Sequence, residues 1–233
     1  MALAIAAAVL LNAYGFAVKG AAIAGYLTKP QSVVAALGLA GASAVLDLVF
    51  IRWKGGSASR HIVSRLRGAS HAAVARGAVL AVLFGAAVFT AVALGTAWLG
   101  ASLMPAEFAT MTAGDLALKV LVRDPILVAV PEELAFRLLL WDLFAAADQG
   151  RNRWLPLTGT TVAFGAWHLA DGLPFGPPAM LGAALLGAVG GATIGVLFER
   201  TRSLPIAVFA HALADAAIAL ARFSLTRFWP SPS

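Results

Sequence analysis

The sequence contains no cysteine and few charged residues, and both features narrow what the chain can be. Without cysteine there is no disulfide framework, no thiol nucleophile and no thiolate metal ligand. Only 12% of the 233 residues are charged, against roughly 25% in a typical soluble domain. The chain is instead 61% hydrophobic, with a mean hydropathy of +0.87. A core of this size cannot bury so much apolar surface, so the composition indicates a membrane protein whose helices are covered by lipid.

Several protease signatures are also missing. There is no GxSG serine motif, and the stretch TAGD at 112–115 lacks the first glycine of the GxGD aspartyl motif. The HExxH signature, in which two zinc ligands lie one helical turn apart, is absent too. These absences argue against serine and aspartyl intramembrane proteases and against a compact helical zinc site.

Seven apolar stretches are candidates for membrane-crossing helices, each of which needs about 20 residues. The expected spans are 2–18, 32–51, 77–104, 117–148, 154–171, 178–198 and 204–222. The first lacks the basic n-region of a signal peptide, so we expect a membrane helix there. The fourth is too long for one simple span and contains Pro125 and Pro131, which predict a break or kink, with residues 117–129 as a separate re-entrant or membrane-surface helix. The predicted fold is an all-α polytopic transmembrane bundle of about seven spans.

The net charge of +6 is concentrated in connectors. The connector 52–76 is the most basic, and we expect it to be a solvated cytoplasmic loop with an amphipathic piece, in which His61 and His71 face solvent. The positive-inside rule then favours a cytoplasmic N-terminus in a multi-pass protein of the cell membrane. The expected partner of the basic loops is anionic membrane lipid rather than nucleic acid.

Ionisable residues at membrane depth cost about 2.5–3.5 kcal/mol each on insertion scales and usually mark function. Spacing sorts the ones found here. Residues four apart share a helix face, so Glu133 can pair with Arg137, while Glu132 lies about 100° around the helix and is left free. The same spacing joins Phe164 to His168 and His211 to Asp215. The candidates at membrane depth are Asp47, Arg123, Asp124, Glu132, Glu133, Arg137, Asp142, His168, His211 and Asp215.

Three motifs in this set occur in a familiar order. EELAFR at 132–137 fits EExxxR, FGAWH at 164–168 fits FxxxH, and HALAD at 211–215 fits HxxxN/D. Together they resemble the CPBP family of CAAX proteases and bacteriocin-processing enzymes, also called the Abi family. The resemblance divides the chain into N-terminal membrane helices (1–116), a catalytic membrane-helix core (117–222) and a C-terminal tail (223–233).

The resemblance implies an intramembrane endopeptidase in which Glu132 is the base that activates water. Glu133 would support the fold through Arg137, and His168 would share the water with Glu132. His211 and Asp215 would stabilise the oxyanion. Many family members have Asn where this chain has Asp215, and an ionised Asp would repel an oxyanion. Asp215 must then be protonated, paired with His211, or used to orient that histidine.

The sequence leaves the metal, the substrate and the oligomeric state open. Glu132, His168 and His211 could form a three-ligand zinc site, although we favour a metal-free, glutamate-activated water with no cofactor. The substrate would be a peptide or protein at the membrane, and the oligomeric state is undetermined.

Two other functions are also possible for such a chain. A proton- or ion-coupled transporter also keeps carboxylates and histidines at membrane depth, but no inverted repeat is visible in the sequence. A non-catalytic scaffold is the other alternative, but it would not require Glu132, His168 and His211 to be present together.

Overall fold

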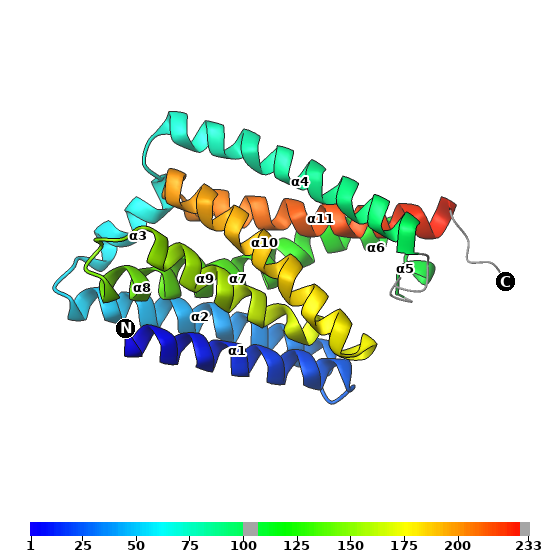
Figure 1. Ribbon diagram of the computed structural model, residues 1–233, viewed down its shortest axis with the longest axis horizontal. Helices are drawn as coiled ribbons and strands as arrows, with labels where there is room; N and C mark the ends of the chain where they lie inside the picture. Colours follow the sequence, from blue (N-terminus) through cyan, green and yellow to red (C-terminus); the bar gives the residue numbers. More distant parts are fainter. Residues whose placement is uncertain (100–106, 229–233) are drawn as a thin grey trace.

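The computed structural model describes residues 1–99 and 107–228 and shows an all-α bundle, with no strand in these two ranges (Figure 1). The predicted fold class is therefore confirmed. The elements, with η marking π-helical segments except for the 3₁₀ helix η5, are α1 (Ala2–Ile23), α2 (Lys29–Trp53), α3 (Ala58–Arg67), α4 (His71–Leu99), α5 (Glu107–Thr110), α6 (Ala113–Leu118), η2 (Lys119–Arg123), η3 (Pro125–Ala129), α7 (Val130–Glu133), η4 (Leu134–Leu140), α8 (Trp141–Ala147), α9 (Trp154–Trp167), η5 (His168–Phe175), α10 (Pro177–Thr201) and α11 (Leu204–Phe228).

Five helices are long and apolar enough to cross a membrane, judged by length and composition. They are α1, α2, α4, α10 and α11. The expected spans 117–148 and 154–171 are helical but do not meet these criteria, so the count of seven is not confirmed. The physical reasons differ. Residues 117–148 contain many charged residues and alternate between short α-helical and π-helical segments. In 154–171, α9 has only 14 residues before the chain tightens into the 3₁₀ helix η5.

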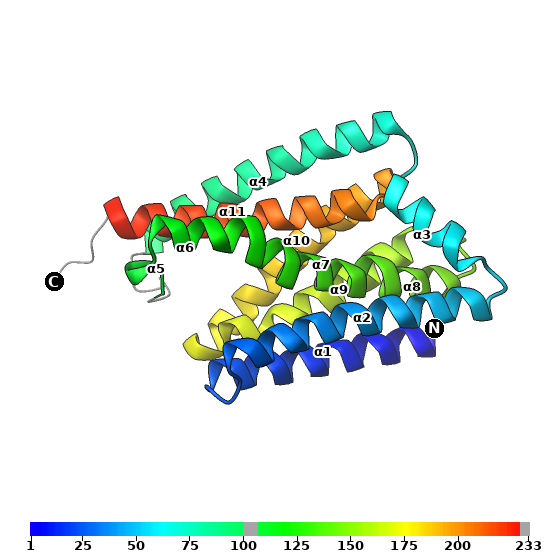
Figure 2. The ribbon, with the colours of Figure 1, turned by 180° about the vertical axis from the view of Figure 1, so that it is seen from behind.

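The chain does not break at Pro125 or Pro131, so the expectation of a separate helix over 117–129 is wrong. Residues 113–147 are helical throughout, with Pro125 at the start of η3, Pro131 in α7 and π-helical turns in η2, η3 and η4. A π-helical turn contains one extra residue, which lets a helix absorb a proline and re-aim its side chains. Figure 2 shows this segment passing from beside α11 to beside α2, and its residues contact both helices. The sequence EELAFR therefore lies in the middle of the bundle.

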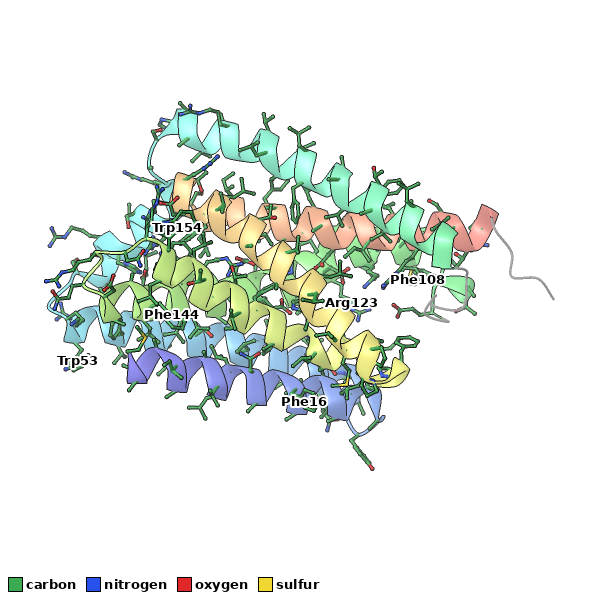
Figure 3. All side chains as sticks on the ribbon, in the orientation of Figure 1. Phe16, Trp53, Phe108, Arg123, Phe144 and Trp154 are labelled. Atoms are coloured by element: carbon green, nitrogen blue, oxygen red, sulfur yellow. The ribbon has the colours of Figure 1, made fainter. Side chains whose placement is uncertain are left out.

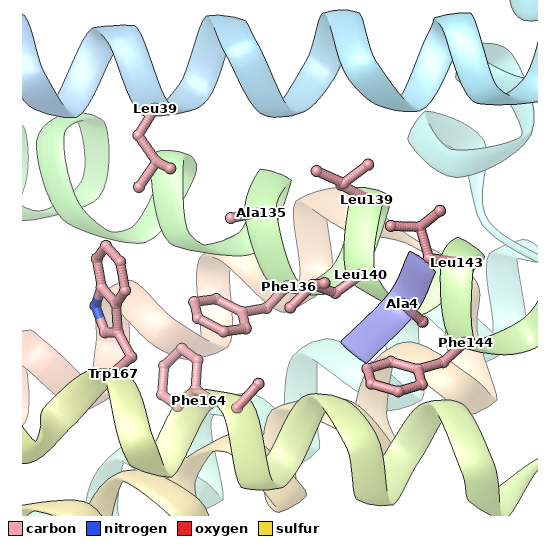
Figure 4. Close-up of a cluster of buried hydrophobic side chains, with 11 residues drawn as sticks. Ala4, Leu39, Ala135, Phe136, Leu139, Leu140, Leu143, Phe144, Phe164 and Trp167 are labelled. Carbon is pink, nitrogen blue, oxygen red and sulfur yellow. The ribbon is translucent and has the colours of Figure 1, made fainter. Parts of the chain in front are cut away.

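The neighbours of this central segment come from both halves of the chain. α4 packs along α11, α10 packs along α9 and η5, and α1 packs on α9. One buried apolar cluster joins α1, α2 and α9 to the central segment around Phe136, Phe164 and Trp167 (Figure 4). The Phe136 ring meets the other two edge-to-face, with centroids 5.0 and 5.8 Å apart. The motif residues thus stand on a rigid aromatic core.

The three basic connectors come together at one end of the bundle. The connector after α2, the turn between α8 and α9, and the turn between α10 and α11 all lie there (Figure 1). The backbone N–H of Ala69 donates to the carbonyl of Thr201 at 2.7 Å, which ties two of them together. Trp53 and Trp154 are exposed at the same end (Figure 3), as expected of side chains that anchor a helix at a membrane surface.

Candidate active site

Glu132 faces the interior of the bundle. Its side chain is buried at the start of the central helix, in α7. The indole Nε1–H of Trp167 donates to Glu132 Oε1 at 2.8 Å. The other oxygen, Oε2, is buried without a hydrogen-bond partner and lies 3.7 Å from Nε2 of His211. One oxygen of the carboxylate is thus fixed, and the other is free to act.

Glu133 connects two of the motifs. Its Oε2 lies 3.4 Å from Nε of Arg137, as the spacing predicted, and its Oε1 lies 2.9 Å from Nδ1 of His211. Arg137 also donates through Nη2 to the carbonyl of Gly191 on α10, at 2.9 Å. Both members of the ion pair are fully buried. The pair therefore fixes both α10 and the ring of His211.

His211 lies among three carboxylates. Its Nδ1 faces Glu133, and its Nε2 faces Glu132 at 3.7 Å and Asp215 at 3.6 Å. With Nδ1–H donated to Glu133, Nε2 is the nitrogen available to a reacting group. Asp215 is partly open, with its side chain 24% exposed, and its Oδ2 has no hydrogen-bond partner.

His168 is held from its own helix. Its Nδ1 lies 2.8 Å from the carbonyl of Phe164, which makes Nδ1 the protonated nitrogen and leaves Nε2 as an acceptor. Phe164 stands between the two imidazoles, with its ring centroid 4.6 Å from that of His168 and 5.6 Å from that of His211. In the described part of the chain, no nitrogen of His168 lies within 4.0 Å of a Glu132 oxygen.

Gly187 on α10 sets the position of the His168 ring, and this predicts a stability difference. A Cβ at Gly187 would lie 2.7–2.8 Å from His168 atoms, whereas one at Gly190 would meet nothing within 4 Å. Gly187→Ala should therefore lower the free energy of unfolding by about 1–3 kcal/mol through overpacking. Gly190→Ala should leave it unchanged or raise it by up to ~1 kcal/mol. Denaturation of both variants in the same detergent measures the difference, and equal stabilities would contradict the close contact.

Sequence reasoning missed contributions from outside the motifs. Lys19 on α1 lies over the Trp167 ring, 5.1 Å from its centroid, and its Nζ is 3.0 Å from Asp171 on η5. Asp171 is also 3.9 Å from Nε2 of His168. Trp167 occupies an unspecified position of the FxxxH motif, so its bond to Glu132 was not predicted, although its place directly before His168 was a usable signal. Nothing in the sequence connects Lys19 to residues 152 positions away.

One residue away from this site is placed differently from expectation, and two others are placed by the structure alone. His61 was expected in solvent, but its side chain is only 13% exposed and lies between Asp47 and Asp142. That expectation was wrong because α3 folds back against α2 and α8. Asp124 is buried and pairs with Lys119 at 3.1 Å, while Arg123 is exposed (Figure 3).

Comparison with protein families supports the resemblance independently of the structure. The family model described as Type II CAAX prenyl endopeptidase Rce1-like matches residues 114–217. The match confirms the resemblance to the CPBP family. All three CPBP motifs lie within the matched residues, whereas α1 to α4 lie outside them. No curated protein and no solved structure matches the chain.

Proposed function

We propose that the chain is an intramembrane endopeptidase of the CAAX prenyl protease type. It would cross the cell membrane several times and cleave a peptide bond in a membrane-associated substrate. The observation that carries the proposal is the state of Glu132: one carboxylate oxygen is held by Trp167, and the other is buried and unbonded beside His211 Nε2. Such an oxygen can accept a proton from water at a fixed position, which general-base catalysis requires.

In the proposed reaction, Glu132 Oε2 takes a proton from water as the water oxygen bonds to the scissile carbonyl carbon. The carbonyl π electrons move to oxygen and form an oxyanion. The C–N bond then breaks, and protonated Glu132 returns the proton to the leaving amine. His168 Nε2 would accept a hydrogen bond from the attacking water. His211, held by Glu133 and surrounded by three carboxylates, would act as an imidazolium and donate its Nε2–H to the oxyanion.

Asp215 would act through His211 in this scheme. Its Oδ2 is nearest to His211 Nε2, at 3.6 Å, so the carboxyl group is placed to orient that nitrogen or to share a proton with it. Either arrangement removes the repulsion that an isolated carboxylate would exert on an oxyanion. This is the role we propose for an acid where many CPBP members have an amide.

A catalytic zinc would need ligand atoms that converge. Among the described residues, Glu132, His168 and His211 do not place three ligand atoms within 4.8 Å of one another. We therefore derive no step through a metal.

The experiment is a cleavage assay with the purified full-length chain in liposomes. A library of membrane-anchored peptides, including prenylated C-termini, would be incubated with and without a chelator, and new termini would be mapped by mass spectrometry. We expect cleavage that a chelator does not prevent. Cleavage that needs added zinc although the protein is equally folded without it would overturn the metal-free mechanism. Proton-coupled flux without cleavage of any peptide would favour a transporter instead.

A further inference from the structure

A second group of chemistry-bearing side chains lies well away from Glu132. Asp47 on α2, His61 on α3 and Asp142 on α8 each bring one ligand atom to the same point, with the three atoms all within 4.8 Å of one another. Asp142 comes ten residues after Glu132 in the central helix, which is about 15 Å at 1.5 Å per residue. The group therefore lies outside the proposed catalytic site, at the end of the bundle where the basic connectors meet.

The geometry at His61 is that of a ligand set. His61 Nε2 lies 3.0 Å from Asp47 Oδ2 and 3.0 Å from Asp142 Oδ2. The imidazole nitrogen thus has two carboxylate oxygens at the same short distance, and none of the three atoms has a hydrogen-bond partner of strict geometry. One nitrogen and two oxygens that converge in this way can bind an ion between them.

Asp47 supplies the independent indication of a ligand. Its side chain is completely buried, and both of its oxygens lack a hydrogen-bond partner. Ser43, one turn earlier on the same helix, is also buried, and its Oγ is unbonded. Burying a carboxylate without hydrogen bonds is unfavourable unless it is paired with a charge or coordinates a metal.

Arg65 completes the surroundings. Its Nη2 bonds Asp142 Oδ1, and its guanidinium lies over the Phe198 ring, 5.1 Å from the centroid. This contact turns the other oxygen, Oδ2, towards His61. Ligating carboxylates are characteristically held in this way by a hydrogen bond on their second oxygen.

We propose that Asp47, His61 and Asp142 bind one divalent transition-metal ion, with Zn²⁺ as the best fit. One imidazole nitrogen and two carboxylate oxygens are ligands that zinc accepts, with a fourth position left for water. Tetrahedral zinc at its usual bond lengths separates its ligand atoms by about 3.4 Å, so the observed 3.0 Å separations need only a small expansion. The ion would clamp the basic amphipathic helix α3 against α2 and α8.

The test measures zinc bound to the purified full-length protein, by elemental analysis and by competition with a chromophoric chelator. Wild type should hold one Zn²⁺ per chain, and Zn²⁺ should raise its melting temperature. Asp47→Asn and His61→Gln should lose both effects. Arg65→Gln should weaken binding by about 10- to 100-fold, since it removes only the orienting contact.

Two matched controls give the measurement its specificity. His71→Gln replaces the exposed histidine at the start of α4, and Glu132→Gln changes the proposed catalytic base; both should bind Zn²⁺ as wild type does. Zinc bound equally by wild type, Asp47→Asn and His61→Gln would overturn the proposal. So would zinc that only Glu132→Gln releases, which would place the ion in the catalytic site.

A metal-free alternative gives an opposite result. The carboxylates of Asp142 and Asp47 raise the pKa of His61 to about 9, so a protonated imidazole could hold the cluster by charge alone. Stability from such a cation is fully present below the unfolded pKa of about 6.5 and is lost as the pH rises through about 9. A pH-dependent loss of this kind in wild type, with no effect of Zn²⁺ at any pH, would overturn the metal site.

Discussion

Replacing Glu132 by Gln is expected to abolish peptide cleavage while leaving the protein folded. The amide keeps the size of the side chain, and its oxygen can still accept the Trp167 N–H bond that holds Oε1 at 2.8 Å. It cannot, however, take a proton from water. Loss of a general base typically lowers a rate by about 100- to 10,000-fold, and the larger figure is expected here because the same group returns the proton to the leaving amine. The rate of product formation under single-turnover conditions measures the effect.

The control for this variant is a glutamate that carries no proposed role. Glu107 is exposed at the start of α5, so Glu107→Gln makes the same chemical change outside the site and should cleave at the wild-type rate. Glu132→Gln should also bind the substrate peptide as wild type does, because only the chemical step is removed. A Glu132→Gln enzyme that retains more than a tenth of the wild-type rate would rule Glu132 out as the base.

The second large effect is expected on stability, from Arg137→Met. Methionine approximates the apolar stem of arginine but leaves Glu133 buried without its cation and frees the carbonyl of Gly191. Breaking a fully buried ion pair from one side typically costs about 3–5 kcal/mol. Unfolding by denaturant in detergent should show a loss of this size, and Arg200→Met, at an exposed position near the end of α10, should show almost none.

A double variant separates the charge from the packing. Glu133→Gln combined with Arg137→Met removes both charges, so the uncompensated carboxylate is no longer present. We expect the double variant to be more stable than Arg137→Met alone. If the two are equally unstable, the effect of Arg137 comes from its packing and its bond to α10. The Glu133 bond to His211 also predicts that cleavage will fall in the double variant, even where the fold is retained.

Helical spacing explains which side-chain pairs could be predicted from the sequence. The i,i+4 relation put Glu133 with Arg137 on one face and left Glu132 on another, and both features recur in the structure. It also placed Asp215 beside His211. What spacing could not indicate is that Glu133 would also hold His211 from 78 residues away, because that contact depends on how α11 is rotated against the central helix.

His61 is a second residue whose surroundings the sequence could not predict. In the sequence it lies in a basic polar connector, where a histidine is expected to be in solvent. The packing of α3 against two other segments buries it between carboxylates at positions 47 and 142. The prolines of the central helix are a third case, since local rules predict a break or kink and the structure has a continuous helix with π-helical turns.

By itself the sequence determined that this is an all-α membrane protein with three charged helix faces, because composition and helical period act locally. Only the tertiary structure decided which carboxylate meets which imidazole, and that a second cluster exists at the basic end. Those pairings join residues distant along the chain, and they depend on the rotation and depth at which helices pack, which no spacing within a single helix specifies.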